Sequence, residues 1–213
     1  MTRHFEFLVE EPSMEAFLNE LLPRLLPKGC TFQIHTFQGK QDLLGNLESR
    51  LRGYSSWLPP DWRIVVVVDL DNEDCQQLKS RMEQIATKVG LRTRSQSPSS
   101  WQIVNRIAIE ELEAWYFGDW DAVVTAYPRV SPDVPQKQKY RNPDGIRNAW
   151  ETLEQLFQRH GYFKGGLLKV TVARNLGQHF DPQRCQSQSF ICLREAILEA
   201  VSCHDAHHDR ILP

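Results

Sequence analysis

The chain has 213 residues, of which 41% are hydrophobic and 24% are charged, with six Trp and ten Phe. This composition is typical of a folded globular protein and excludes a disordered or fibrous chain. The longest apolar run, residues 64–68, is far shorter than the roughly 20 residues of a membrane helix, and residues 1–10 lack a signal-peptide pattern. We therefore expect a cytoplasmic protein without a membrane partner. The five scattered cysteines include no CxxC pair, which indicates neither a disulfide framework nor a structural zinc site.

The net charge of −2 argues against a polycationic coat for nucleic acid, but the two parts of the chain differ in charge. Residues 1–127 hold 13 Lys and Arg against 18 Asp and Glu, whereas residues 128–213 hold 12 against 9. An acidic first part followed by a basic second part suits a metal site beside a phosphate-binding surface. Uneven sampling of a solvated surface explains the same charges equally well.

Strand and helix signals alternate along the first 95 residues, which favours a mostly parallel sheet with helices on its faces. The predicted strands cover residues 4–9, 31–37 and 63–69, and the predicted helices cover residues 13–25, 43–53 and 78–89. Ser13 is the expected N-cap of the first helix. The continuous apolar run RIVVVVD predicts a strand that is buried on both faces. A fourth strand is expected over residues 91–94 and a further extended segment over residues 101–108.

The later part of the chain looks helical. Residues 109–117 have helical spacing, and residues 128–144 contain four prolines, which predicts a long loop. Further helices are expected over residues 146–157, 167–176 and 190–201. We therefore predict an α/β domain over residues 1–127 and a basic loop with a helical extension, residues 128–213, that packs on it. The run 203–213 could bind a transition metal, but it is more typical of a solvated terminus.

Acidic residues follow two of the predicted strands at the point where each strand ends. Glu10 closes the first strand, and Asp69 and Asp71 close the buried strand in VVVVDLDNED. Because the carboxyl ends of parallel strands meet at one edge of a sheet, we expect these carboxylates to lie close together. A carboxylate such as Asp69 at the end of an apolar strand must be solvated, paired or metal-bound. Oxygen ligands are those that Mg²⁺ prefers, so the sequence predicts a Mg²⁺ or Mn²⁺ site there.

Three further carboxylates could belong to this site. Glu15 lies one turn into the first helix and could face the same cleft, and Glu111 with Glu113 could complete a second metal position. Each has a structural alternative, because acidic residues in the first turn of a helix are stabilised by its dipole. In the same way, Asp71 and Asn72 are natural N-caps for the third helix.

The opening of the chain, LVEEPSMEAFLNELLP, resembles the LVEGxSE-type opening of TOPRIM-like domains, and DLD resembles their DxD motif. Such domains occur in topoisomerases, primases, small maturases and overcoming-lysogenization-defect nucleases. A closer resemblance, to an uncharacterised bacterial family with a TOPRIM-like fold, covers nearly the whole chain. It rests on the segments GKQDLL, VVVVDLDNEDC, IEELEAWYFGD and GYFKGGLLK. Members of that family are often encoded beside an ATPase.

The resemblance implies a TOPRIM-like fold and a role for each acidic residue. Glu10 matches the glutamate that acts as a general acid or base or as a metal ligand, and Asp69 and Asp71 match the metal-binding aspartates. Glu15 matches the second acid of the nuclease-type opening. Glu11 stands where such openings commonly have Gly, so the turn after the first strand must be built differently. The chain is too short for a topoisomerase and lacks the accessory regions of a primase.

Basic residues complete the functional hypothesis. The candidates for contacts with nucleic-acid phosphates are Lys137, Lys139, Arg141 and Arg147. Tyr140 lies among them and could stack on a base. Lys164 and Lys169, in FKGGLLK, are candidate catalytic residues that could stabilise charge at a cleaved phosphate, and Lys40 could approach the same site. A solvated basic loop is the structural alternative.

The sequence supports three functional hypotheses. The first is a Mg²⁺- or Mn²⁺-dependent nuclease that hydrolyses DNA or RNA, with Glu10, Asp69 and Asp71 at its metal site. The second is a phosphatase of the haloacid-dehalogenase type, although its DxD motif normally lies on the first strand. The third is a non-catalytic metal-binding subunit that works with a separately encoded ATPase in a defence system. The helical part could form a homodimer or partner surface.

Overall fold

Four parallel strands form the central sheet of the computed structural model, which describes residues 2–202. The strands are β1 His4–Val9, β2 Thr31–Thr36, β3 Trp62–Asp69 and β4 Ile103–Ala108, in the spatial order β2-β1-β3-β4. The expected α/β fold with a parallel sheet is therefore confirmed. The His- and Asp-rich run 203–213 lies outside the described residues.

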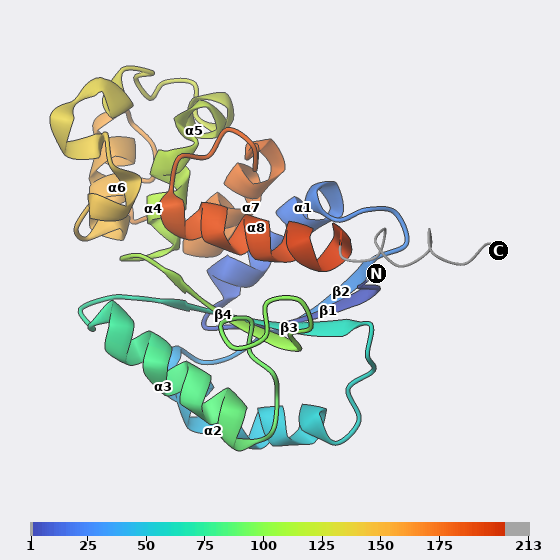
Figure 1. Cartoon of the computed structure of the whole chain (residues 1–213). Helices are drawn as coiled ribbons and strands as arrows, with labels where there is room; N and C mark the ends of the chain where they lie inside the picture. Colours follow the sequence, from blue (N-terminus) through green and yellow to red (C-terminus); the bar gives the residue numbers. More distant parts are fainter. Residues whose placement is uncertain (1, 203–213) are drawn as a thin grey trace.

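Helices cover both faces of this sheet. They are α1 Pro12–Leu25, α2 Lys40–Ser55, α3 Cys75–Lys88, α4 Leu112–Gly118, α5 Trp120–Ala126, α6 Ala149–Arg159, α7 Lys169–His179 and α8 Gln188–Ser202. Figure 1 shows α2 and α3 on one face and the other helices on the opposite face. The proline-rich loop forms three short 3-10 turns, Val134–Gln136, Gln138–Tyr140 and Pro143–Gly145. None of the helices within residues 2–202 is long and apolar enough to span a membrane.

The apolar run of β3 lies at the centre of the sheet and separates two cores. Val65 and Val67 face the larger core, whereas Ile64, Val66 and Val68 face the smaller core against α2 and α3. This alternation follows from the period of two in a strand, and it explains why every residue in the run had to be apolar. The strand therefore holds its final carboxylate rigidly at one edge of the sheet.

The extension encoded after residue 127 shares the larger core with the first part of the chain. Helix α7 lies against α1, where the ring of Phe17 meets that of Phe180 at a centroid distance of 5.0 Å. At Gly177 the two helices approach so closely that a Cβ atom would lie 2.9 Å from the Phe17 carbonyl oxygen. The extension thus packs on the sheet, and it places α7 close to the carboxyl edge of the sheet.

Two local predictions are wrong. Helix α1 starts after Glu11 and not after Ser13, because Pro12 occupies the first helical position, for which its fixed φ is well suited. The Ser13 hydroxyl instead donates a hydrogen bond to the Glu11 carboxylate. Residues 91–94 form no strand, and only Thr93 makes an isolated bridge to β4.

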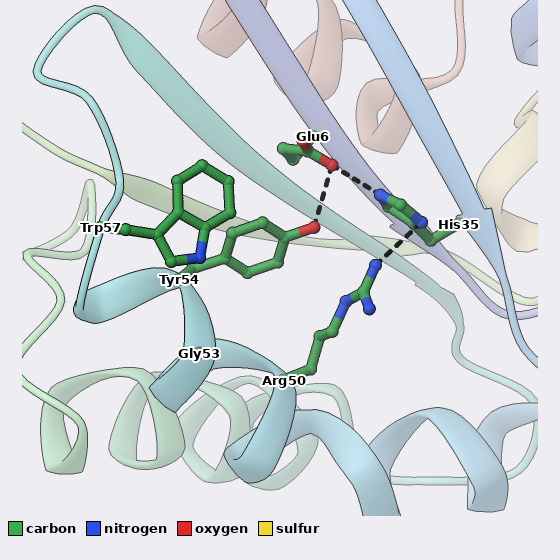
Figure 2. A pocket seen from close by; sticks show the side chains of 6 residues that line it. All are labelled: Glu6, His35, Arg50, Gly53, Tyr54 and Trp57. Atoms are coloured by element: carbon green, nitrogen blue, oxygen red, sulfur yellow. Dashed lines mark hydrogen bonds and ion pairs between the residues drawn. The ribbon is translucent and has the colours of Figure 1, made fainter.

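A polar network lies beneath β1 and borders a cavity of about 220 Å³ (Figure 2). The Glu6 carboxylate accepts a hydrogen bond from the Tyr54 hydroxyl at 2.9 Å and lies 2.6 Å from Nε2 of His35. Nδ1 of His35 lies 2.9 Å from the Arg50 guanidinium, which can only donate. The Nε2 proton of His35 therefore points to Glu6. This buried carboxylate is satisfied entirely by its own neighbours.

Candidate active site

The predicted acidic residues do meet at the carboxyl edge of the sheet. Glu10 follows β1 directly, and Asp69 is the last residue of the adjacent β3. The Glu10 carboxylate accepts a hydrogen bond from the Asp69 backbone N–H at 3.1 Å. The Asp69 side chain is buried, so its charged form loses hydration. Burial raises the pKa of Asp69 well above its usual value, and the neighbouring carboxylates of Glu113 and Glu10 raise it further.

Asp71 lies in the turn after β3 and has an uncommon backbone conformation. Its φ is 51°, and that of Glu110 after β4 is 64°, both in the left-handed region. The Asp71 N–H donates to the Glu110 carbonyl at 3.0 Å, which ties the two strand ends together. The cap of α3 is Asp74, whose carboxylate accepts from the Gln77 N–H. Asp71 is therefore no helix cap, and strained non-glycine residues of this kind cluster at functional sites.

Lys40 lies closer to the acidic residues than the sequence alone predicts. Its Nζ lies 2.6 Å from Asp71 and 3.2 Å from Glu73, and it donates to the Leu70 carbonyl at 3.0 Å. Its position could have been inferred from the order of elements, because a residue that starts the helix after β2 lies at the same sheet edge as Glu10. Lys40 therefore compensates part of the negative charge of the site.

Glu113, in the first turn of α4, is the most deeply buried acid in this region. Burial raises its pKa to about 8, because the charged form loses its hydration. Repulsion from Glu11 and Glu111 raises the pKa as well, and these effects together outweigh the attraction of Lys169. Burial alone would lower the pKa of Lys169, but the carboxylates of Glu113 and Glu11 raise it. The ammonium of Lys169 lies 3.8 Å from Glu11 and 4.6 Å from the centroid of the Trp150 ring. It is therefore a fixed cation beside the acids.

Several buried oxygen atoms of the cluster have no hydrogen-bond partner. They are Oδ1 of Asp69, Oε2 of Glu113 and the hydroxyl of Tyr116. Such atoms are rare in folded proteins and point to a missing ion or water. Within residues 2–202, no three His, Cys, Asp or Glu side chains form a ready-made metal site. Mg²⁺ keeps several waters and often uses only one or two carboxylates, so the unpartnered oxygens of Asp69 and Glu113 are the ones that would suit a hard divalent cation.

The remaining predicted ligands, Glu15 and Glu111, already accept hydrogen bonds from other residues. The Glu15 carboxylate accepts a hydrogen bond from the Thr36 hydroxyl at 2.6 Å, at the end of β2. Glu111 precedes α4 and accepts from the Trp150 N–H at 2.8 Å, which connects the site to α6. Both residues lie at the same edge of the sheet, but each carboxylate already has one partner.

Only some of the predicted basic residues lie close to the acidic cluster. Lys169 joins the acidic cluster, whereas Lys164 is exposed and forms no hydrogen bond or ion pair with any residue in the described range. The four basic candidates of the loop are all exposed: Lys137, Lys139, Arg141 and Arg147. The Arg147 guanidinium pairs with Glu110 at 2.7 Å. The prediction for Tyr140 is wrong. Its ring is buried and stacks on Phe117 at a centroid distance of 5.5 Å, so no nucleotide base can reach it.

Comparisons with known proteins place this chain in a family. Among curated proteins, no sequence matches it. A solved structure, the C-terminal region of the Burkholderia pseudomallei OLD protein, is similar over 94% of this chain and 99% of that chain, with 16% identity and a TM-score of 0.49. The sequence profile of a family described as a domain of unknown function, DUF4276, matches residues 9–197. The prediction of an uncharacterised family is thereby confirmed, and the chain belongs to the DUF4276 family.

Proposed function

We propose that this protein is a Mg²⁺- or Mn²⁺-dependent nuclease that hydrolyses phosphodiester bonds in DNA or RNA. The observation that carries the proposal is the pair of unsatisfied buried oxygens, Oδ1 of Asp69 and Oε2 of Glu113, beside Glu10 at the carboxyl edge of a parallel sheet. Ligands of α/β folds bind at this edge. Two cations, Lys40 and Lys169, flank the acids and suit a negatively charged substrate.

Asp69 and Glu113 would hold the divalent ion, Asp71 would complete the site, and Glu10 would act beside it as the general base. When bound, such an ion polarises a phosphate oxygen and lowers the pKa of a water molecule. Oε2 of Glu10 is occupied by the Asp69 N–H, which leaves Oε1 to accept a proton from the attacking water. Burial raises the pKa of Glu10, which makes it a stronger base than a solvated carboxylate.

Lys169 would stabilise the charge that develops on the cleaved phosphate. Its ammonium is held by Glu11 and by the face of Trp150, so it needs little reorganisation during the reaction. The exposed side chains that would contact the nucleic-acid backbone are Lys137, Lys139, Arg141 and Arg147. Because Arg147 also pairs with Glu110, it would link this basic surface to the strand end that carries the acids.

The test is a cleavage assay on supercoiled plasmid, linear duplex, single-stranded DNA and RNA, with Mg²⁺ or Mn²⁺ and with EDTA. We expect cleavage that needs the metal and that is lost in Asp69→Asn, whereas Asp121→Asn, an exposed change on α5, keeps it. The assay is repeated with a partner ATPase if one is encoded nearby. Turnover of p-nitrophenyl phosphate without cleavage of any polymer would contradict the proposal and favour the phosphatase hypothesis.

A further inference from the structure

A second cavity, of about 300 Å³, lies beside the outer edge of β4. Helix α3 borders it from one face of the sheet and helix α8 from the other, and Figure 1 shows these two helices on opposite faces. Two isoleucines, Ile107 and Ile109, form apolar walls, and two thiols, Cys75 and Cys192, line its sides. The volume lies at the lower end of the range of ligand pockets, which suits a compact molecule.

The cavity contains a cation without a partner. The guanidinium of Arg106 forms no hydrogen bond with any residue from 2 to 202, and its Nε is buried. Burial lowers the pKa of Arg106, and the nearby charge of Arg94 lowers it further. A buried guanidinium is normally paired with an acid, because its desolvation is otherwise uncompensated.

The acids in reach of Arg106 are already used by other groups. Glu199 pairs with Arg94, and Glu83 pairs with Lys79 at 3.0 Å. Asp144 is the acidic side chain among the lining residues, and it accepts three hydrogen bonds from neighbouring serines. The charges of Glu83 and Glu199 offset part of the lowering of the Arg106 pKa, but neither carboxylate forms a hydrogen bond or ion pair with Arg106.

Asn105 precedes Arg106 in β4, so its side chain points to the opposite face of the sheet, towards α3. Asn105 is completely buried, and its side-chain N–H donates to Glu83 at 2.9 Å, but its Oδ1 has no partner. The cavity beneath β1 differs in this respect, because the polar groups of Glu6, Tyr54 and His35 pair with one another (Figure 2). Of the two cavities, the one beside β4 is therefore the one lined by a cation that has no hydrogen-bond partner within residues 2–202.

We propose that the cavity beside β4 binds a small organic anion. Its carboxylate or phosphate group pairs with the Arg106 guanidinium, and an apolar body packs on Ile107 and Ile109. The site is distinct from the acidic cluster and does not depend on the proposed nuclease activity.

The two lining thiols provide a direct test of binding. Alkylation of Cys75 and Cys192 by iodoacetamide is followed by mass spectrometry of the whole chain's peptides, with partly exposed Cys30, which lies outside the cavity, as internal reference. The probes are benzoate for a carboxylate source, phenyl phosphate for a phosphate source and benzyl alcohol as the neutral analogue. The anion that binds, at a concentration about ten times its dissociation constant, should slow alkylation of Cys75 and Cys192 about tenfold. The alkylation rate of Cys30 should not change.

Variants of Arg106 separate ligand binding from a structural role. Arg106→Gln removes the charge, so the anion no longer protects Cys75 or Cys192. Because the guanidinium has no partner to lose, Arg106→Met melts at the same temperature as the wild type or higher. The proposal is overturned if neither anion protects the thiols, if benzyl alcohol protects equally, if Arg106→Gln keeps the protection, or if Arg106→Met melts at a clearly lower temperature.

Discussion

Replacing Glu113 by Gln should stabilise the metal-free protein, and the gain should grow with pH. Burial raises the pKa of Glu113 to about 8, against an ordinary value of 4.5. Below pH 4.5 the carboxyl is protonated in both the folded and the unfolded chain and has no effect on stability. As the pH rises from 4.5 towards 8, the unfolded chain ionises while the folded chain keeps its proton, so the folded state loses stability. Each pH unit in this window costs about 1.4 kcal/mol.

Between pH 5 and pH 8 the wild-type carboxyl should therefore remove about 3–4 kcal/mol from the free energy of unfolding. A glutamine of the same shape does not titrate, so the Glu113→Gln curve should be flatter by that amount. The measurement is urea unfolding at several pH values in EDTA. Glu151→Gln, an exposed change on α6, is the matched control and should follow the wild type. Parallel curves for wild type and Glu113→Gln would refute the argument that this carboxyl is buried and protonated.

Three further outcomes follow from the packing and the charges. Gly177→Ala should destabilise the fold by about 1–3 kcal/mol, because its Cβ would meet the backbone of α1, whereas Gly45→Ala on the open side of α2 should stabilise it by about 0.5–1 kcal/mol in urea unfolding. Tyr140→Ala should cost about 3 kcal/mol through lost packing on Phe117, and thermal melts should show this loss without any nucleic acid present. Lys40→Met should tighten Mn²⁺ binding several-fold in calorimetry, by about 1 kcal/mol or less, because it releases partly exposed carboxylates; weaker binding would contradict this role.

The elements that sequence reasoning located well are those with a strong period. The run from Ile64 to Val68 had to be a strand buried on both faces, and its position in the sheet placed Asp69 beside Glu10. Chain order alone then brought the acids together, because parallel strands end at the same edge. The central part of the candidate site was therefore predictable without a structure.

The predictions that were wrong or incomplete concern residues whose positions depend on contacts between distant parts of the chain. Local propensity could not tell which of four consecutive polar residues would cap α3, and the structure selects Asp74, which leaves Asp71 free for Lys40. Tyr140 lies among basic residues in sequence, but the 3-10 turn around it directs the ring into the core. The role of Lys169 follows from the packing of α7 on α1, which no local pattern reveals.

The pairing of α1 with α7 also sets a condition on how the protein is made. Helix α1 ends at Leu25 and α7 begins at Lys169, so a ribosome adding about 5–20 residues per second needs roughly 7–30 seconds to supply the second helix after the first. Until then the part of α1 that packs on α7 is uncovered, and the acids of the strand ends lack their lysine from α7. A chain that stalls before residue 169 would carry the carboxylates without the cation beside them, so the candidate site is completed only after α7 has been synthesised.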